Sequence, residues 1–156
     1  MRIISFVFIL MAVGFCHAGG ETSGQQGPMV IYQSEEPFED VIDNIKMAIE
    51  ERGMLVSGTL HVSEMLNRTG PDLGYKQVFE KAESVEFCSA SISHQMTQAA
   101  PENMTICPFT ISVYIKAGEP DQLFVSYRRP SLAGDAVKVT GAINELLGGI
   151  IQDSIE

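Results

Sequence analysis

The chain has 156 residues, which is enough for one domain with a substantial hydrophobic core. It carries 20 acidic residues against 10 lysines and arginines, so its formal net charge at pH 7 is −10. An acidic chain is repelled by nucleic acid, and no basic run with interleaved aromatic residues offsets that repulsion. We therefore expect no nucleic-acid binding, and we interpret the acidity as a solvated surface that keeps the protein soluble.

The N-terminus has the pattern of a secretory signal peptide. Arg2 precedes a mostly apolar run over residues 3–15, and the small residue Ala18 ends the segment. This order predicts a signal peptide over residues 1–18, cleaved near Ala18, and a periplasmic or secreted protein. The apolar run is too short to span a bilayer, and we expect no transmembrane segment in the mature chain. Cleavage removes Arg2 and no acid, which changes the formal charge from −10 to −11.

The mature chain divides into a short polar segment and one domain. Residues 19–27 read GGETSGQQG and have no apolar side chain to bury, so we expect a flexible N-terminal arm. Residues 28–156 contain all the remaining apolar patterns and no internal repeat, which predicts a single domain.

The first half of this domain mixes strands and helices. Residues 29–32 predict a short strand. Residues 38–53 predict an amphipathic helix, because apolar side chains recur at helical spacing and acids occupy the first turn. A second strand is expected over residues 54–62, and one short helical turn over residues 63–68, ahead of Gly70-Pro71.

The second half continues the same mixture. Residues 75–82 fit a strand and a helix equally well, and Gly148-Gly149 is expected to weaken the last helix. The other predicted elements are a strand over residues 84–88, a helix over 90–99, a long strand over 104–116, its antiparallel partner over 123–127, and a helix over 135–155. Together they predict an α+β fold, a two-layer sandwich of a mainly antiparallel sheet with helices packed on one face.

The cysteines of the mature chain, Cys88 and Cys107, form the main candidate site together with the nearby His94. The expected export and the even number of cysteines in the mature chain favour a disulfide between Cys88 and Cys107. The expected strand order opposes it: if the chain returns after Cys88 to begin a parallel strand, Cys107 lies at the far end of the sheet. A disulfide needs Cα atoms within about 7 Å. The sequence therefore leaves two interpretations possible: a disulfide between the two cysteines, and two unpaired cysteines with His94 on the surface.

A soft-metal site is the third interpretation of the same residues. Thiolate, imidazole and thioether groups suit copper(I), and thiolates with imidazole suit zinc. Cys88, His94 and Cys107, with Met96 as a further ligand, would supply these groups. However, the spacing from Cys88 to His94 is not a standard zinc signature, and methionine more often fills a core. If these residues do bind a metal, their ligand types make copper and zinc the candidate cofactors.

Arg128 and Arg129 are a candidate contact for an anion or for an acidic group of a partner. Neighbouring side chains on a strand point to opposite faces, so one salt bridge plus one solvated charge is the competing interpretation. The common sequence signatures of hydrolases, nucleotide-binding proteins and zinc proteases are absent, and we predict no catalytic residues.

Several short motifs occur in an order that resembles the domain of unknown function 302 family. The motifs are Phe38-Glu39-Asp40-Val41, Glu51-Arg52-Gly53-Met54, Phe87-Cys88 with the following His94, Cys107-Pro108-Phe109 and Ile111-Ser112-Val113-Tyr114. The resemblance covers most of residues 28–156. It implies a compact two-layer fold related to the TATA-binding-protein-like architecture, and family members that often form dimers. It implies no established activity.

These observations predict a small exported, non-enzymatic binding or accessory protein with an unidentified small ligand or protein partner. We expect it to self-associate as a homodimer. The alternative is a protein that handles a soft metal, copper or zinc, or exchanges thiols, using Cys88, His94 and Cys107.

Overall fold

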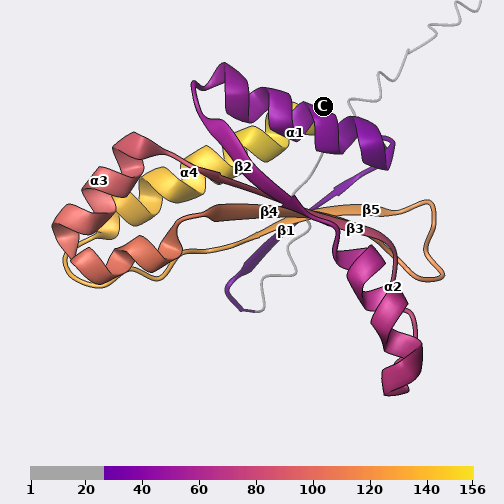
Figure 1. Ribbon diagram of the computed structural model, residues 1–156. Helices are drawn as coiled ribbons and strands as arrows, with labels where there is room; N and C mark the ends of the chain where they lie inside the picture. Colours follow the sequence, from indigo (N-terminus) through magenta and orange to yellow (C-terminus); the bar gives the residue numbers. More distant parts are fainter. Residues whose placement is uncertain (1–26) are drawn as a thin grey trace, which may run out of the picture.

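A five-stranded antiparallel sheet organises residues 27–156, the part of the chain that the computed structural model describes (Figure 1). The predicted signal peptide, and all of the predicted arm except Gly27, lie outside the described residues. The strand order is β1-β5-β4-β3-β2, so β1 and β2 form the two edges. The strands are β1 (Met29–Ser34), β2 (Leu55–Leu60), β3 (Phe79–Cys88), β4 (Phe109–Lys116) and β5 (Leu123–Arg128).

Helices α1 (Phe38–Glu51) and α4 (Val137–Ser154) cover one face of this sheet, and α3 (Ala90–Ala99) lies beside α4 (Figure 1). A short 3-10 helix, η1 (Pro101–Ile106), follows α3 and leads into β4. The predicted α+β sandwich is therefore confirmed. Helix α2 (Val62–Leu73) differs from the other helices, because it projects away from the opposite side of the sheet (Figure 1). None of the helices that the structure describes combines the length and apolarity needed to cross a membrane.

The core lies between the sheet and helices α1 and α4. Val85, Ile111 and Tyr127 stand side by side in register on β3, β4 and β5, and all are buried. Ile45 of α1 and Ile150 of α4 are fully buried in the same cluster. Because each buried aliphatic side chain of this size contributes about 1.5–3 kcal/mol, this face holds the sandwich together.

Most of the predicted elements are confirmed close to their expected bounds. The helix predicted over residues 38–53 is α1, and the helix predicted over residues 90–99 is α3, whose Ser89 caps the N-terminus by accepting a hydrogen bond from the Ile92 N–H. The strands predicted over residues 29–32 and 123–127 are β1 and β5, which pair with each other.

Three elements differ from the sequence prediction. Strand β3 begins at Phe79, so part of the segment 75–82, which fitted a strand and a helix equally well, is continuous with the strand predicted over 84–88. The single turn expected at residues 63–68 is the whole of α2, which runs past Gly70-Pro71 to Leu73. Pro71 lies in the last turn, where a helix tolerates the loss of one N–H donor better than in its middle. Gly74, with φ 75°, closes the helix by donating to the carbonyls of Gly70 and Pro71. The strand expected from residue 104 begins only at Phe109, because residues 101–106 form η1. Pro101 pre-sets the first φ angle of η1, and a proline at that position favours a helical start.

Gly148 allows α4 to approach β1 closely. Helix α4 is continuous from Val137 to Ser154, although the sequence predicted that Gly148-Gly149 would weaken it. A Cβ atom on Gly148 would lie 3.3 Å from the Tyr32 hydroxyl oxygen of β1. The absent side chain therefore brings the helix against the sheet, and packing compensates for the low helix propensity of glycine.

Candidate functional site

Cys88 and Cys107 are joined by a disulfide, with their Cα atoms 5.9 Å apart. The expectation that the sheet keeps them at opposite ends is wrong, because β3 and β4 are adjacent and antiparallel. The end of β3 therefore meets the beginning of β4, and Phe87 pairs with Phe109 in the register. The chain between the two cysteines forms α3 and η1 and returns to the same edge of the sheet.

The residues proposed as metal ligands do not converge. His94 is exposed on α3, whereas Met96, two residues further along the same helix, is fully buried in the core. Within residues 27–156 no group of three or more histidine, cysteine, aspartate and glutamate side chains could hold a metal ion. The sulfurs of Cys88 and Cys107 are bonded to each other, so residues 27–156 offer no thiolate ligand for copper or zinc.

Arg128 and Arg129 line a cleft of about 270 Å³. The cleft lies where η1, the beginning of β4, the end of β5 and α4 meet. Arg128 is the last residue of β5, and the Arg129 N–H donates to the Pro28 carbonyl at 2.6 Å, which fixes the backbone just beyond the strand. The lining residues are Thr105, Ile106, Pro108, Phe109, Thr110, Arg128, Arg129, Pro130, Ser131, Ile143 and Leu147.

Neither guanidinium of this pair forms an ion pair or a side-chain hydrogen bond with the described part of the chain. The interpretation that one of these arginines forms a salt bridge is therefore wrong for residues 27–156. Other cations of the protein do find acids: Arg52 pairs with Asp153, and Lys81 pairs with Glu39 at 2.6 Å. Arg128 and Arg129 thus keep their hydrogen-bond donors available in a chain that has twice as many acids as lysines and arginines.

The cleft combines an apolar interior with a polar lining. Phe109, Ile143 and Leu147 are buried side chains of the core cluster, and they contribute its apolar part. Thr105, Thr110 and Ser131 add hydroxyl groups beside the two arginines. Ligand sites in proteins commonly join apolar walls to a few polar groups, and arginine is suited to hold a carboxylate through parallel hydrogen bonds.

Sequence reasoning missed the hydroxyl groups and the apolar wall of this cleft. Thr105 comes from η1, which the sequence predicted as a strand, and Leu147 lies on α4, close to the glycines expected to weaken that helix. These residues meet only through the tertiary structure. The one sequence signal of the cleft is the adjacent pair Arg128 and Arg129.

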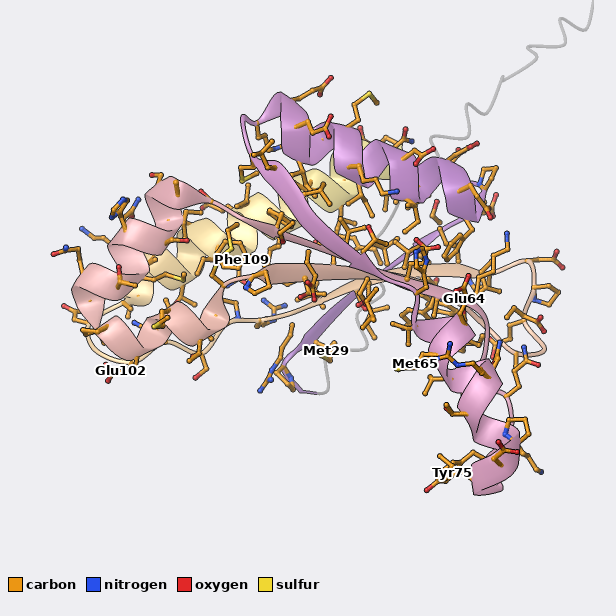
Figure 2. The ribbon with its side chains drawn as sticks, in the orientation of Figure 1. Met29, Glu64, Met65, Tyr75, Glu102 and Phe109 are labelled. Atoms are coloured by element: carbon orange, nitrogen blue, oxygen red, sulfur yellow. A yellow bond between two sulfur atoms is a disulfide. The ribbon has the colours of Figure 1, made fainter. Side chains whose placement is uncertain are left out.

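A second surface feature is the α2 projection, defined as residues 62–78, which comprise α2 and the segment that returns to β3. The Ser63 hydroxyl anchors it to β3, because it accepts a hydrogen bond from the Ala82 N–H at 3.0 Å. No residue of α2 is buried, and Leu73 and Tyr75 are 67% and 72% exposed. Figure 2 shows Met65 on this projection and Tyr75 at its far end. A groove of about 580 Å³ runs along it, lined by apolar side chains that include Leu66 and Val78.

Within the part of the chain that the structure describes, two titratable groups have shifted pKa values, and neither lines the arginine cleft. The hydrogen bond from Lys81 holds the pKa of Glu39 below its usual value, which fits the position of this exposed acid at the start of α1. Burial raises the pKa of Tyr114, which stacks on Phe124 with ring centroids 5.3 Å apart. Tyr114 lies on the sheet face opposite the core, in register with Ala82.

The fold and the cleft define a small α+β protein with an antiparallel sheet and an arginine-lined cleft at one end of the neighbouring strands β4 and β5. The family model described as "Domain of unknown function DUF302" matches residues 30–152. The chain therefore belongs to the DUF302 family, and the resemblance seen in its motifs is confirmed.

A solved structure shares this fold. The chain is similar to the crystal structure of an uncharacterized conserved DUF302 protein from Bacillus stearothermophilus, with a TM-score of 0.67 and 14% sequence identity. The similarity covers 83% of this chain and 98% of that one. No curated protein sequence matches this chain significantly. The comparisons establish the family and the fold, and the function must be argued from the site.

Proposed function

We propose that this protein is a small exported binding protein whose arginine cleft takes a small organic anion with an apolar body, such as a carboxylate. The observation that carries the proposal is the unpaired state of Arg128 and Arg129 within the described residues, beside a buried apolar wall. A guanidinium that has no acidic partner within an acid-rich chain can bind the carboxylate of a ligand instead. The apolar wall accounts for the body of that ligand.

Because the protein is negatively charged overall, the binding of an anion depends on the groups inside the cleft. A chain of formal charge −10 repels an anion at long range, so binding must come from short, direct contacts. Each hydrogen bond between a guanidinium and a carboxylate contributes about 1.5–3 kcal/mol. Phe109 and Leu147 exclude water from one side, which strengthens those contacts by lowering the local dielectric.

The lining of the cleft supports binding rather than catalysis. Its polar side chains are arginine, threonine and serine, and it includes no histidine, aspartate, glutamate or cysteine. A hydrolytic or proton-transfer site needs a group that can gain or lose a proton near neutral pH. The hydroxyls of Thr105, Thr110 and Ser131 can donate hydrogen bonds to a ligand, but the cleft has no base to activate them as nucleophiles.

Export of the protein is part of the proposal and rests on two observations. Residues 1–18 have the charged, apolar and small-residue order of a signal peptide. In addition, the disulfide between Cys88 and Cys107 is of a kind that persists in oxidising compartments. A periplasmic or secreted location accounts for both.

A titration followed by amide NMR tests the binding function. Benzoate carries a carboxylate on an apolar ring, benzamide has nearly the same shape without the charge, and inorganic phosphate is an anion without an apolar body. We expect benzoate to shift the amides around Thr110 and Arg129, and benzamide and phosphate to bind more weakly. Equal shifts with benzoate and benzamide, or no shift in the cleft with any of the three, would contradict the proposal.

We also propose that a second copy of the chain covers the α2 projection, which gives the expected homodimer. The projection exposes apolar side chains that no described element covers, including Leu66, Leu73 and Tyr75. Residues 62–78 contain two acids, Glu64 and Asp72, and two bases, Arg68 and Lys76, so their net charge is zero. Two chains of charge −10 repel each other least where such neutral surfaces meet.

A further inference from the structure

We propose that the redox state of the Cys88–Cys107 disulfide controls anion binding in the arginine cleft. This inference rests on the binding function proposed above and adds its regulation. The disulfide and the cleft are adjacent in the structure, because one of the two cysteines lies within a wall of the cleft. Cys107 is flanked by Ile106 and Pro108, and both of these neighbours line the cleft.

The disulfide is the covalent anchor of this wall. Residues 105–110 form the wall, apart from Cys107 itself, and the bond to Cys88 fixes its centre to the end of β3. The opposite wall is formed by Arg128, the last residue of β5, and by Arg129 to Ser131, which follow it. Thr110 is held in the β4 ladder, so it is the distance between the Thr105 hydroxyl and the guanidinium groups of the other wall that depends on where the disulfide holds Cys107. Binding sites lose affinity when such supporting restraints loosen by a fraction of an ångström.

The anchors that remain after reduction are fewer and weaker. The Cys107 N–H donates to the Met104 carbonyl at 3.2 Å, and the buried side chain of Asn103 bonds to Ala133. Both contacts hold residues before or at Cys107, and neither reaches β3. The link to β3 that remains is the pairing of Phe109 with Phe87, which begins two residues after Cys107. Reduction therefore frees the segment from Ile106 to Pro108 to move relative to the two arginines.

The rest of the fold does not depend on the disulfide. Val85, Ile111 and Ile150 are fully buried, and they hold the sheet against the helices through apolar contacts. Residues 88 and 107 are only partly buried, at one edge of this core. We therefore expect the reduced protein to keep its sheet and to lose the geometry of the cleft, which separates a switch from general unfolding.

A dithiol is the co-reactant of this switch. One thiolate of the dithiol attacks a sulfur of the disulfide and forms a mixed disulfide, and its second thiolate then releases the protein. The bond between the Cys88 and Cys107 sulfurs breaks and each cysteine gains a proton, while the dithiol becomes a cyclic or bridged disulfide. Two electrons pass from the dithiol to the protein. Partial exposure of both cysteines gives the reductant access.

The experiment measures benzoate affinity of the full mature chain by NMR titration before and after treatment with dithiothreitol. This dithiol is uncharged, so it does not compete for the arginine cleft. We expect the reduced protein, with two thiols counted per chain, to bind benzoate about tenfold more weakly, which corresponds to about 1.4 kcal/mol. Amide exchange at Cys107 should rise, the amides of Ala133, β3 and β4 should keep their protection, and reoxidation should restore the affinity.

The variant Cys88→Ser with Cys107→Ser is the matched control. It should bind benzoate as weakly as the reduced protein and should not respond to dithiothreitol. Equal affinity of the oxidised and reduced forms overturns the regulation and leaves the binding function standing. Loss of the whole folded spectrum on reduction overturns it too, because the disulfide would then support the fold as a whole. If the oxidised protein does not bind benzoate, the binding function itself fails, and the regulation fails with it.

Discussion

Asn103 and Ala133 bond to each other through both the donor and the acceptor of the asparagine side chain. The Asn103 amide nitrogen donates to the Ala133 carbonyl at 3.1 Å, and its carbonyl oxygen accepts from the Ala133 N–H at 2.8 Å. Asn103 belongs to η1, and Ala133 lies just after the wall formed by Arg128 to Ser131. One buried side chain, 3% exposed, therefore ties together the two segments that border the arginine cleft.

Replacing Asn103 with alanine should loosen the cleft and destabilise the protein. Its side chain also donates to the Met96 carbonyl at 3.0 Å, and all of these partners lose their bonds in the variant. We expect the free energy of unfolding to fall by about 2–4 kcal/mol, because three hydrogen bonds of a buried side chain are lost, each worth about 0.5–1.5 kcal/mol. Urea unfolding of Asn103→Ala measures this change. The exposed Asn67→Ala on the α2 projection is the control, and an equally small effect of both variants would contradict the role given to Asn103.

Gly134 is the glycine whose replacement should cost most. It has φ +75°, and a Cβ atom built on it would lie 2.6 Å from the Ala99 carbonyl oxygen. Gly118 has a similar φ of +83° and no atom within 4 Å of such a Cβ, so it isolates the backbone effect from the clash. We expect Gly118→Ala to cost about 1 kcal/mol of unfolding free energy and Gly134→Ala about 3 kcal/mol. Thermal unfolding compares the two variants. Equal losses of unfolding free energy would contradict the clash, because the loop at Gly134 would then move away from Ala99 without loss of stability.

Self-association should depend on the apolar side chains of the α2 projection. The variant Leu66→Glu with Leu73→Glu places two acids in the proposed interface, and we expect its dimer dissociation constant to rise about tenfold or more. Light scattering across a range of protein concentrations measures the change. Val137→Glu is the control, because this side chain is 80% exposed but lies at the start of α4. A purely monomeric wild-type protein at high concentration would contradict the proposed dimer.

Ionisation of Tyr114 should destabilise the protein in alkaline solution. Burial raises the pKa of its phenol above the ordinary value of 10.0. A raised pKa in the folded state means that the stability contributed by the neutral phenol is complete below the unfolded pKa and is lost as pH rises through the folded pKa. Tyr114→Phe should therefore lose less stability than the wild type between pH 9 and pH 11, as urea unfolding can measure. The variant Tyr75→Phe, at a mostly exposed position, should behave as the wild type does.

The fold was predictable from the sequence because its strongest patterns are local. Residues 38–49 repeat apolar side chains at helical spacing, and residues 109–115 alternate as a buried strand does, so α1 and β4 could be identified without a structure. The extent of α2 was not predictable in this way. Its apolar side chains face no described partner, and Gly70-Pro71 normally ends a helix.

The site was predictable only in part. The pair Arg128 and Arg129 was visible in the sequence, but its unpaired state depends on where every acid of the fold lies. The sequence could not decide for or against the disulfide for a similar reason. Cys88 and Cys107 meet because β3 and β4 are antiparallel neighbours, and strand order is a long-range property that local patterns do not determine.

The affinity for benzoate of the variant Arg128→Gln with Arg129→Gln tests the binding function most directly. Glutamine keeps a hydrogen-bonding group on a shorter side chain and removes both charges, so we expect binding to weaken about 10- to 100-fold, with the folded spectrum unchanged. Arg68→Gln, on the α2 projection, removes one charge elsewhere and should bind benzoate as the wild type does. Wild-type affinity in the Arg128 and Arg129 variant, or an equal loss in Arg68→Gln, would contradict an anion site in this cleft.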